Sequence, residues 1–440
     1  MIHVTLDKKE TEISFDIDIN FRTAILGENG IGKTSILESI ASKSSKKDWL
    51  SVFVPENIGV RYLSQIELKT QAISGGEHMK QRLEALFSQI AEVYVLDEPT
   101  NNLDKNNIEW LKQYIINNKL PVVFTSHDIE FIDEIAEVIF YLDSKSVDKT
   151  KEKCSLYLVS RQKKIEHAFL MYEVALKKQR ELLDSAQKAK QKSEAGSKWK
   201  GTDNDKFLRG FNRNAAGKGA STASRLKERA EEMEIERPKT DPLPNVVITP
   251  NIFRGNLFDI TTTTLSQKRI DVSVKSGDKL FLVGANGIGK TTLIEYITKL
   301  LENAKPKVGD SFLRRNKFSY LYIKQDWYEH LDNQKIEEYL ETFGLNREEK
   351  YKSLSFNRID RNVLNKQFKD ISPGIRIKVL LGVLSCKKYD LIIWDEPTNH
   401  LDVMTQFVLR DAFLKYDGGL LVVSHDKIFT DNPAFSIILL

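Results

Sequence analysis

The chain has 440 residues, of which 41% are hydrophobic and 29% charged, and its formal net charge is +4. This length predicts two to four domains, and the ordinary apolar fraction excludes a wholly disordered or fibrous protein. The chain has two cysteines, Cys154 and Cys386, too few for a disulfide scaffold, and no apolar run approaches the ~18 residues of a membrane span. We therefore expect a soluble, cytoplasmic protein.

The first part of the chain has the pattern of a strand, a glycine-rich loop and a helix. The apolar run from Phe21 to Gly27 predicts a buried strand that leads into a phosphate-binding loop, and residues 35–40 have helical spacing. Further strands are expected at 93–97 and 121–125, because continuous β-branched runs suit a sheet that is covered on both faces. A Ser-Gly-Gly-Glu stretch at 74–77 precedes a predicted helix at 78–89.

The middle of the chain differs in composition. Residues 160–194 are rich in Lys, Gln, Glu, Ala and Leu and contain no Gly or Pro. This composition predicts a helix of roughly 50 Å. From Lys177 to Arg229 there are 15 Lys and Arg against 6 Asp and Glu, a net charge of 15 − 6 = +9, so the rest of the chain carries 4 − 9 = −5.

A second helical stretch is expected at 221–236, ended by the prolines that follow. We predict an antiparallel helical hairpin, residues 156–244, whose tip at about 196–220 contacts RNA through basic and aromatic side chains. The candidate tip residues are Lys198, Trp199, Lys200, Lys206, Phe207, Arg209, Phe211, Arg213 and Lys218. The alternative is a solvated linker whose aromatic residues only clamp the two helices together.

The last part of the chain repeats the first. The loop at 27–34 recurs at 284–291, and Asp-Glu-Pro-Thr-Asn at 97–101 recurs at 395–399. The Asp of this motif and a later His are separated by 30 residues in both copies (127 − 97 and 425 − 395), and an earlier Ser precedes the Asp by 23 (97 − 74 and 395 − 372). Equal spacings of matching residues predict two homologous α/β domains, at 1–155 and 245–440.

Each repeat contains, in the same order, the residues that bind a nucleoside triphosphate. Glycines let backbone N–H groups turn toward phosphate oxygens, and Lys33 or Lys290 reaches the β- and γ-phosphates. The candidate loop residues are Gly27, Asn29, Gly30, Gly32, Lys33, Thr34 and Ser35, and Gly284, Asn286, Gly287, Gly289, Lys290, Thr291 and Thr292. Asp97 and Asp395 are expected to hold Mg²⁺, and Glu98 and Glu396 to polarise a water. The alternative, that these acids are solvated strand ends, has little weight because both copies carry every part in order.

The stretch Ile73–Glu77 resembles the signature of ATP-binding-cassette (ABC) ATPases. This resemblance implies that ATP and Mg²⁺ are the cofactors and that His127 and His425 act with Glu98 and Glu396 in hydrolysis. It further implies that the signature of one domain closes over the phosphate loop of the other. The implied signature contacts are Ser74, Gly75, Gly76, Glu77, Ser372 and Gly374, and the implied Mg²⁺ residues are Thr34, Gln65, Asp97, Thr291, Gln325 and Asp395.

The second signature departs from the family pattern. Pro373 replaces a glycine and removes a backbone donor, and Ile375 replaces the usual Glu or Gln. The helix itself is expected to survive, because proline is tolerated in the first turn. We predict that the first site, which faces this signature, binds ATP but hydrolyses it differently from the second.

The tandem domains, the charged linker and the Glu-Pro-Thr-Asn-x-Leu-Asp extensions resemble the ABC-F family, whose members act on ribosomes. Gln65 and Ser74 are 9 residues apart (74 − 65), against 47 for Gln325 and Ser372 (372 − 325). The first domain therefore lacks the arm insert, as in antibiotic-resistance members of the Vga/Lsa kind. The resemblance implies a functional monomer that closes on ATP and binds the bacterial 70S ribosome, near rRNA and tRNA of the exit and peptidyl sites. It also implies target protection through a linker directed at the peptidyl-transferase centre, without membrane or DNA as partner.

Two alternatives stay open. One is an ABC-F translation factor that acts on stalled ribosomes without a resistance role, and the other is an ATPase partner of a separate membrane transporter. The residues that stack on adenine are also open, with Phe15 or His3 as candidates in the first half and Phe253 or Phe258 in the second.

Overall fold

The computed structural model of the chain describes residues 1–8, 11–45, 47–64, 75–101, 103, 105–197, 206–238, 240, 243–244, 246–251, 254–263, 269–284, 287–357, 359–398, 401–424 and 426–440. The chain divides into two compact units. One contains Met1–Val159 together with Leu243–Leu440, and the other is Ser160–Pro242. Both repeats therefore lie in the first unit, and we call residues 1–159 the first cassette and residues 243–440 the second cassette.

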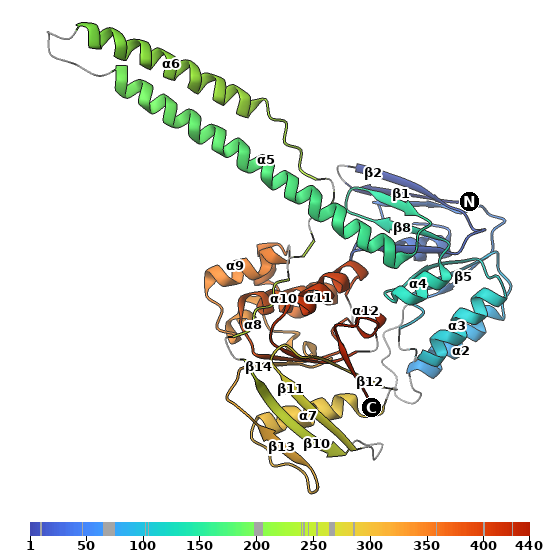
Figure 1. Ribbon diagram of the computed structural model, residues 1–440. Helices are drawn as coiled ribbons and strands as arrows, with labels where there is room; N and C mark the ends of the chain where they lie inside the picture. Colours follow the sequence, from blue (N-terminus) through green and yellow to red (C-terminus); the bar gives the residue numbers. More distant parts are fainter. Residues whose placement is uncertain are drawn as a thin grey trace. The chain divides into compact units, whose positions relative to one another are not determined.

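The first cassette combines a central sheet with a smaller antiparallel one (Figure 1). Over the described residues the central sheet has the order β5-β6-β7-β3-β8-β9, parallel except for the last pair, and the small sheet has the order β2-β1-β4. Its strands are β1 (Ile2–Lys8), β2 (Thr11–Ile17), β3 (Thr23–Gly27), β4 (Leu50–Phe53), β5 (Val60–Leu63), β6 (Val93–Asp97), β7 (Val122–Thr125), β8 (Val138–Leu142) and β9 (Val147–Thr150). Its helices are α1 (Lys33–Ser42), α2 (Gly75–Phe87), α3 (Lys105–Asn117) and α4 (Ile129–Ile135). Every residue of β3, β6, β7 and β8 is buried, as the continuous apolar runs predict.

The second cassette repeats this topology. Its described residues form a parallel sheet of order β14-β15-β16-β12-β17 and a small sheet of order β11-β10-β13. The strands are β10 (Asn256–Thr263), β11 (Arg269–Lys275), β12 (Lys279–Val283), β13 (Ser311–Arg314), β14 (Tyr320–Ile323), β15 (Leu391–Asp395), β16 (Gly419–Val423) and β17 (Ser436–Leu439). The helices are α7 (Lys290–Leu301), α8 (Ile336–Thr342), α9 (Arg347–Phe356), α10 (Pro373–Cys386), α11 (Val403–Lys415) and α12 (Lys427–Thr430), with 3₁₀ turns η1 (Glu329–Leu331), η2 (Arg361–Asn365) and η3 (Phe368–Asp370). The phosphate loop follows the corresponding strand, β3 or β12, in each cassette.

The insert between β14 and α10 has a core of its own. Buried residues of α8, α9 and the 3₁₀ turns pack together, with Tyr339, Leu354 and Phe368 among them. The predicted helix after Ser372 is present as α10, and the Ser372 side chain caps it by accepting a hydrogen bond from the Ile375 N–H. Proline at the first position is therefore compatible with the helix, as expected.

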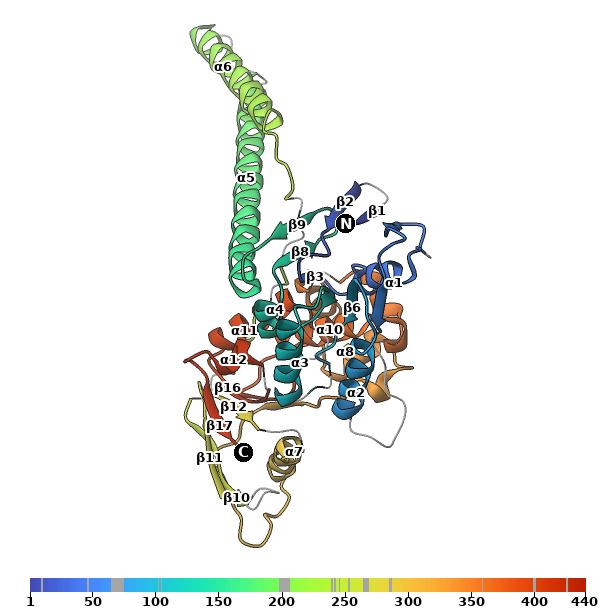
Figure 2. The same cartoon turned by 90° about the vertical axis from the view of Figure 1, so that its right-hand side faces the viewer.

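The second unit contains all but the first residues of α5 (Cys154–Ser197) and all of α6 (Lys206–Glu231), and these two antiparallel helices lie side by side in both views (Figures 1 and 2). The long helix was expected to end at 194, but it continues through Ser197. The second helix was expected at 221–236, after a tip at about 196–220, but α6 already begins at Lys206 and includes residues 206–220.

Helix α6 packs on α5 around Gly219. A Cβ at this position would lie 3.4 Å from the Ser193 Cβ and 3.5 Å from the Ala189 carbonyl oxygen of α5, which are ordinary contact distances. Gln179 donates a hydrogen bond of 2.9 Å to the Ala230 carbonyl across the same pair. Over the described part of the chain, no helix is both long and apolar enough to cross a bilayer.

Candidate nucleotide-binding sites

The first phosphate loop joins β3 to α1 through a left-handed backbone. Gly30 and Gly32 have φ of 82° and 108°, and a Cβ at Gly32 would lie 2.5 Å from the Trp49 ring. Glycine is thus required there for both conformation and space. Lys33 begins α1, and its Nζ donates to the carbonyl oxygens of Gly27 (2.8 Å) and Glu28 (3.1 Å). The ammonium therefore lies inside the loop, with N–H groups of the α1 N-terminus beside it, which is an anion-binding arrangement.

The acidic end of β6 faces this loop. Asp97 is 1% exposed and accepts a hydrogen bond from the Thr125 hydroxyl at 2.8 Å. Glu98 is buried and has a left-handed φ of 50°. Its Oε2 accepts from the His127 backbone N–H at 3.1 Å, and its Oε1 lies 3.3 Å from the His127 Nε2. The fold thus brings the predicted water-polarising carboxylate into contact with the histidine that was expected to act with it in hydrolysis.

Burial sets the protonation of this group. Burial raises the pKa of Glu98 to about 7, although the Lys33 ammonium works in the opposite direction. Burial also lowers the pKa of His127, and Lys33 adds to that effect, so the imidazole is neutral at pH 7. A carboxylate with a pKa near the working pH is well matched to accept a proton from water.

The second cassette completes the first site. A Cβ at Gly374, in the second signature, would lie only 2.8 Å from Asn29 Nδ2 of the first phosphate loop. The Gln406 side chain on α11 lies 3.5 Å from the His127 carbonyl oxygen. Asp402, which caps α11, is close enough to Lys33 and His127 to favour their protonated forms. The predicted juxtaposition of the second signature with the first loop is therefore present.

An ion-pair network crosses the cassettes beside that site. Lys427 Nζ, at the start of α12, lies 2.5 Å from Glu130 Oε1 on α4. Glu130 also accepts from Lys112 at 3.0 Å, and Lys112, whose side chain is 4% exposed, pairs with Glu109 and Glu134 as well. Since α4 begins two residues after His127, this network connects the second cassette to the histidine segment of the first.

The second site repeats the geometry of the first. Gly289 caps α7 with φ of 103°, and Lys290 Nζ donates to the Gly284 carbonyl at 2.7 Å. Asp395 is 1% exposed, and burial raises its pKa against the opposing effect of Thr291. Glu396 has a left-handed φ of 51°, close to that of Glu98.

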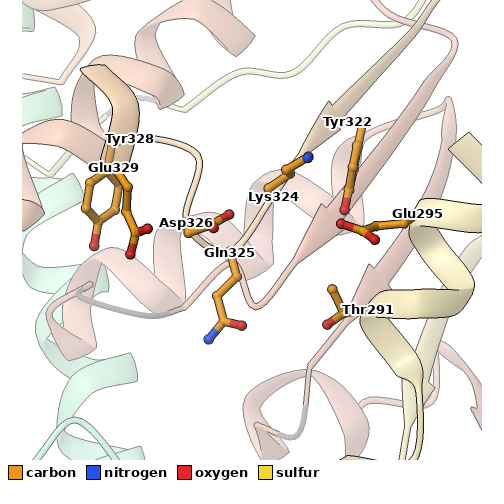
Figure 3. A pocket seen from close by; sticks show the side chains of 8 residues that line it. All are labelled: Thr291, Glu295, Tyr322, Lys324, Gln325, Asp326, Tyr328 and Glu329. Atoms are coloured by element: carbon orange, nitrogen blue, oxygen red, sulfur yellow. The ribbon is translucent and has the colours of Figure 1, made fainter. Parts of the chain in front are cut away.

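A pocket of about 420 Å³ opens beside the second loop (Figure 3). It is lined by Thr291, Glu295, Tyr322, Lys324, Gln325, Asp326, Tyr328 and Glu329. Figure 3 shows the Glu295 carboxylate beside the Tyr322 hydroxyl, with Thr291 on the same side of the pocket and Gln325 across from it. Thr291 and Gln325, both predicted Mg²⁺ residues, thus share one polar pocket.

The residues present fit a magnesium ion. Oδ2 of Asp97 is buried and has no hydrogen-bond partner among the described residues, so an acceptor is available where the ion is expected. Mg²⁺ prefers oxygen ligands and keeps several waters, which suits one carboxylate and one hydroxyl beside phosphate oxygens. Thr34 with Asp97, and Thr291 with Asp395, would hold it.

Several predicted residues lie outside the described part of the chain. These are Gln65, Ser74, Asn286, His425, Lys198, Trp199 and Lys200. Gly75, Gly76 and Glu77 are described only as the first residues of α2, and Lys206, Phe207, Arg209, Phe211 and Arg213 only as backbone of α6. Lys218 is exposed on α6.

Two adenine-stacking candidates are wrong. Phe15 packs against Phe140 at a ring distance of 4.9 Å in the first core, and Phe258 is fully buried beside Phe312. His3 instead pairs with Asp16 at 2.7 Å, and Phe253 lies outside the described residues. Both Phe residues lie at inward-facing positions of strands with alternating apolar residues, and this alternation could have predicted their burial.

Sequence reasoning missed the residues that join the cassettes. Gln406, Glu130 and Lys427 belong to no recognised motif, and Asp402 was used only as the last residue of the Glu-Pro-Thr-Asn-x-Leu-Asp extension, without a role at the first site. The sequence predicted only that the second signature lies opposite the first phosphate loop. It did not predict which residues of the neighbouring helices α4, α11 and α12 would contact each other.

The comparisons agree with this geometry. The family described as "ABC transporter" matches residues 267–399. The chain is 26% identical to the ribosome protection protein VmlR of Bacillus subtilis over 94% of this chain and 80% of that protein. It is 29% identical to the erythromycin resistance ATP-binding protein MsrA of Staphylococcus epidermidis, over 93% and 90%.

The chain is an ATPase, and its matched region resembles the ABC transporter family. The relatives support the ABC-F group, since the chain is also 27% identical to ABC transporter F family member 2 of Arabidopsis thaliana, over 89% of this chain. It spans only about half, 55%, of that plant protein.

A solved structure shows the same fold. The archaeal ribosome recycling factor aABCE1, solved with the ribosomal stalk protein aP1, superposes with a TM-score of 0.58 at 15% identity, over 99% of this chain and 86% of that one. The fold is thus α/β, with two tandem P-loop ABC ATPase domains joined by a long helical hairpin.

Proposed function

We propose that this ATPase binds the bacterial 70S ribosome in its ATP-bound closed state and confers antibiotic resistance by target protection. The hairpin linker would reach toward the peptidyl-transferase centre, near tRNA of the exit and peptidyl sites, and ATP hydrolysis would drive release. The protein would act as a monomer in the cytoplasm, without a membrane or DNA partner. The observation that carries the ATP-dependent closure is the approach of Gly374 to Asn29, since it joins both cassettes at one nucleotide site.

Nucleotide supplies the energy for closure by binding the closed state more tightly than the open one. A shift of the open-to-closed ratio from 1:99 to 99:1 requires about 5.5 kcal/mol, or about 2.7 kcal/mol from each of two nucleotides. A phosphate chain between Lys33 and the α10 N-terminus would touch both cassettes, and so it favours closure.

Hydrolysis uses the residues around Glu98. Its carboxylate accepts a proton from the attacking water, and the neutral His127, held 3.3 Å away, keeps that carboxylate oriented. Mg²⁺, when bound, neutralises charge on the β- and γ-phosphates. Loss of the γ-phosphate removes the bridge to α10, and the cassettes separate.

The ribosome enters the proposal through charge and relatives. Residues 177–229 carry a net charge of 15 − 6 = +9, and such a segment favours phosphate backbones. VmlR is named as a ribosome protection protein and MsrA as a resistance protein. Both likenesses support a ribosomal partner for this chain.

The test is sedimentation of the Glu98→Gln/Glu396→Gln variant with bacterial ribosomes, with and without ATP. We expect it to pellet with ribosomes only when ATP is present. A Lys33→Ala/Lys290→Ala variant is the control and should stay in the supernatant under both conditions. The proposal is overturned if the variant pellets with ribosomes equally with and without ATP. It is also overturned if the variant pellets under neither condition.

Resistance is tested in cells. Wild type should raise the inhibitory concentration of ribosome-directed antibiotics, and the Glu98→Gln/Glu396→Gln variant should not. Ribosome binding without any change in resistance would favour the translation-factor alternative. Copurification with membranes and not with ribosomes would favour the transporter-partner alternative.

A further inference from the structure

Two tyrosine–glutamate pairs repeat beside the nucleotide sites. Tyr62 and Tyr322 lie on β5 and β14, and Glu38 and Glu295 lie on α1 and α7. Each glutamate follows the loop lysine by five residues (38 − 33 and 295 − 290), and each tyrosine precedes an implied Mg²⁺ glutamine, Gln65 or Gln325, by three (65 − 62 and 325 − 322). The cassettes differ elsewhere by a large insert, so this repetition indicates a shared requirement of the site.

The tyrosine hydroxyl groups are buried and unsatisfied. Among the described residues, neither the Tyr62 nor the Tyr322 hydroxyl oxygen has a hydrogen-bond partner, although both are inaccessible to solvent. A buried hydroxyl without a partner costs about 1–3 kcal/mol, and native structures pair most such groups. The partner is therefore expected to be part of the nucleotide complex.

Each tyrosine lies among carboxylates. Burial raises the pKa of Tyr62, and the charges of Asp97 and Glu38 raise it further. The pKa of Tyr322 is raised in the same way by burial and then by Asp395 and Glu295. Both hydroxyl groups stay protonated at neutral pH and can donate as well as accept a hydrogen bond.

The pocket beside the second site has room for water. Its volume of about 420 Å³ is far larger than a single water requires. Tyr322 and Glu295 lie together on the side of the pocket that contains Thr291 (Figure 3). Protein-bound Mg²⁺ keeps several waters, and each of those waters has two protons to donate.

We propose that Tyr62 with Glu38, and Tyr322 with Glu295, hold the hydration waters of Mg²⁺ in the two nucleotide sites. The glutamates accept hydrogen bonds from these waters. Each tyrosine hydroxyl bridges between these waters and the buried carboxylate of Asp97 or Asp395. They are positioning residues, since they act through water and do not touch the reacting atoms. This inference rests on the Mg²⁺–ATP chemistry of the proposed function and is independent of the ribosome.

The experiment measures Mg²⁺ directly. The full-length protein is loaded with a non-hydrolysable fluorescent ATP analogue in EDTA, and the Mg²⁺ concentration that half-saturates the fluorescence change is determined. The variants are Tyr62→Phe/Tyr322→Phe and Glu38→Gln/Glu295→Gln. Because partners outside the direct ligands typically contribute 10–100-fold to metal affinity, we expect a midpoint about tenfold higher in each. Binding of Mn²⁺, followed by electron paramagnetic resonance, should weaken in parallel.

Affinity for the analogue in EDTA should stay within about twofold of wild type, because the phosphate-loop contacts are intact. Glu302→Gln, at the far end of α7, is the matched charge control and should leave the Mg²⁺ midpoint unchanged. If both double variants keep the wild-type midpoint, or if they lose nucleotide affinity equally with and without Mg²⁺, the proposal is wrong. Ribosome sedimentation does not enter this readout, so failure of either proposal is visible separately.

Discussion

Glu98 is expected to destabilise the protein above neutral pH. Its side chain is 6% exposed, and burial raises its pKa from 4.5 to about 7. Since the folded carboxyl holds its proton longer than the unfolded one, its stabilising contribution is complete below pH 4.5 and is lost as the pH rises through about 7. Linkage converts the difference between these two pKa values into a loss of folding free energy, relative to low pH, of about 3 kcal/mol at pH 8 and about 1 kcal/mol at pH 5. Glu98→Gln should therefore stabilise the protein by about 2 kcal/mol more at pH 8 than at pH 5.

The assay is thermal unfolding of nucleotide-free protein at pH 5 and pH 8. For a domain of this size, each kcal/mol moves Tm by roughly 2–4 °C, so the gain in Tm should be about 4–8 °C larger at pH 8. Glu396→Gln is the matched control, since Glu396 is only half-buried. An equal gain at both pH values, or a larger one at pH 5, would refute the burial argument.

Three further outcomes follow from the contacts between the cassettes. Gly374→Ala places a methyl group against Asn29, at an overpacking cost of about 1–3 kcal/mol. ATP-driven closure, measured by fluorescence transfer between labelled cassettes, should therefore weaken by about tenfold. Ser372→Ala should weaken closure less. Lys427→Gln removes the pair with Glu130, which is partly exposed, so closure should weaken by only about two- to fivefold at low salt and by nothing measurable in 1 M NaCl. Pro373→Gly restores a backbone donor, and in a variant with an inactive second site it should raise ATP turnover several-fold; an unchanged rate would show that the two sites do not differ for this reason.

The sequence predicted the cassettes well because their signals are local and repeated. The strand before each loop and the helix after it are fixed by runs of apolar residues and by glycines with left-handed φ, such as Gly30 and Gly32. Equal spacing in two copies then removed most of the ambiguity of a single motif. The strand orders of the two central sheets agree in the same way.

The hairpin was predicted less well, for a tertiary reason. The second helix was expected to begin at 221, yet the backbone is helical from Lys206. Near Gly219 the helix packs on Ser193 and Ala189 of α5, which lie 26 and 30 positions away along the chain (219 − 193 and 219 − 189). Likewise the pair of Lys427 with Glu130 joins residues 297 positions apart (427 − 130), and no local pattern contains it.

The left-handed backbone at Glu98 and Glu396 has a consequence for how such enzymes change over time. A glutamate at φ near 50° adopts a conformation that favours Gly or Asn, and at Glu98 the charge is also buried. Replacing the base by Asn would relieve both costs at once, so loss of hydrolysis at a site makes the fold more stable. Selection for turnover must therefore act continuously to keep each glutamate, and in a tandem protein a site whose turnover is dispensable drifts readily into one that only binds nucleotide.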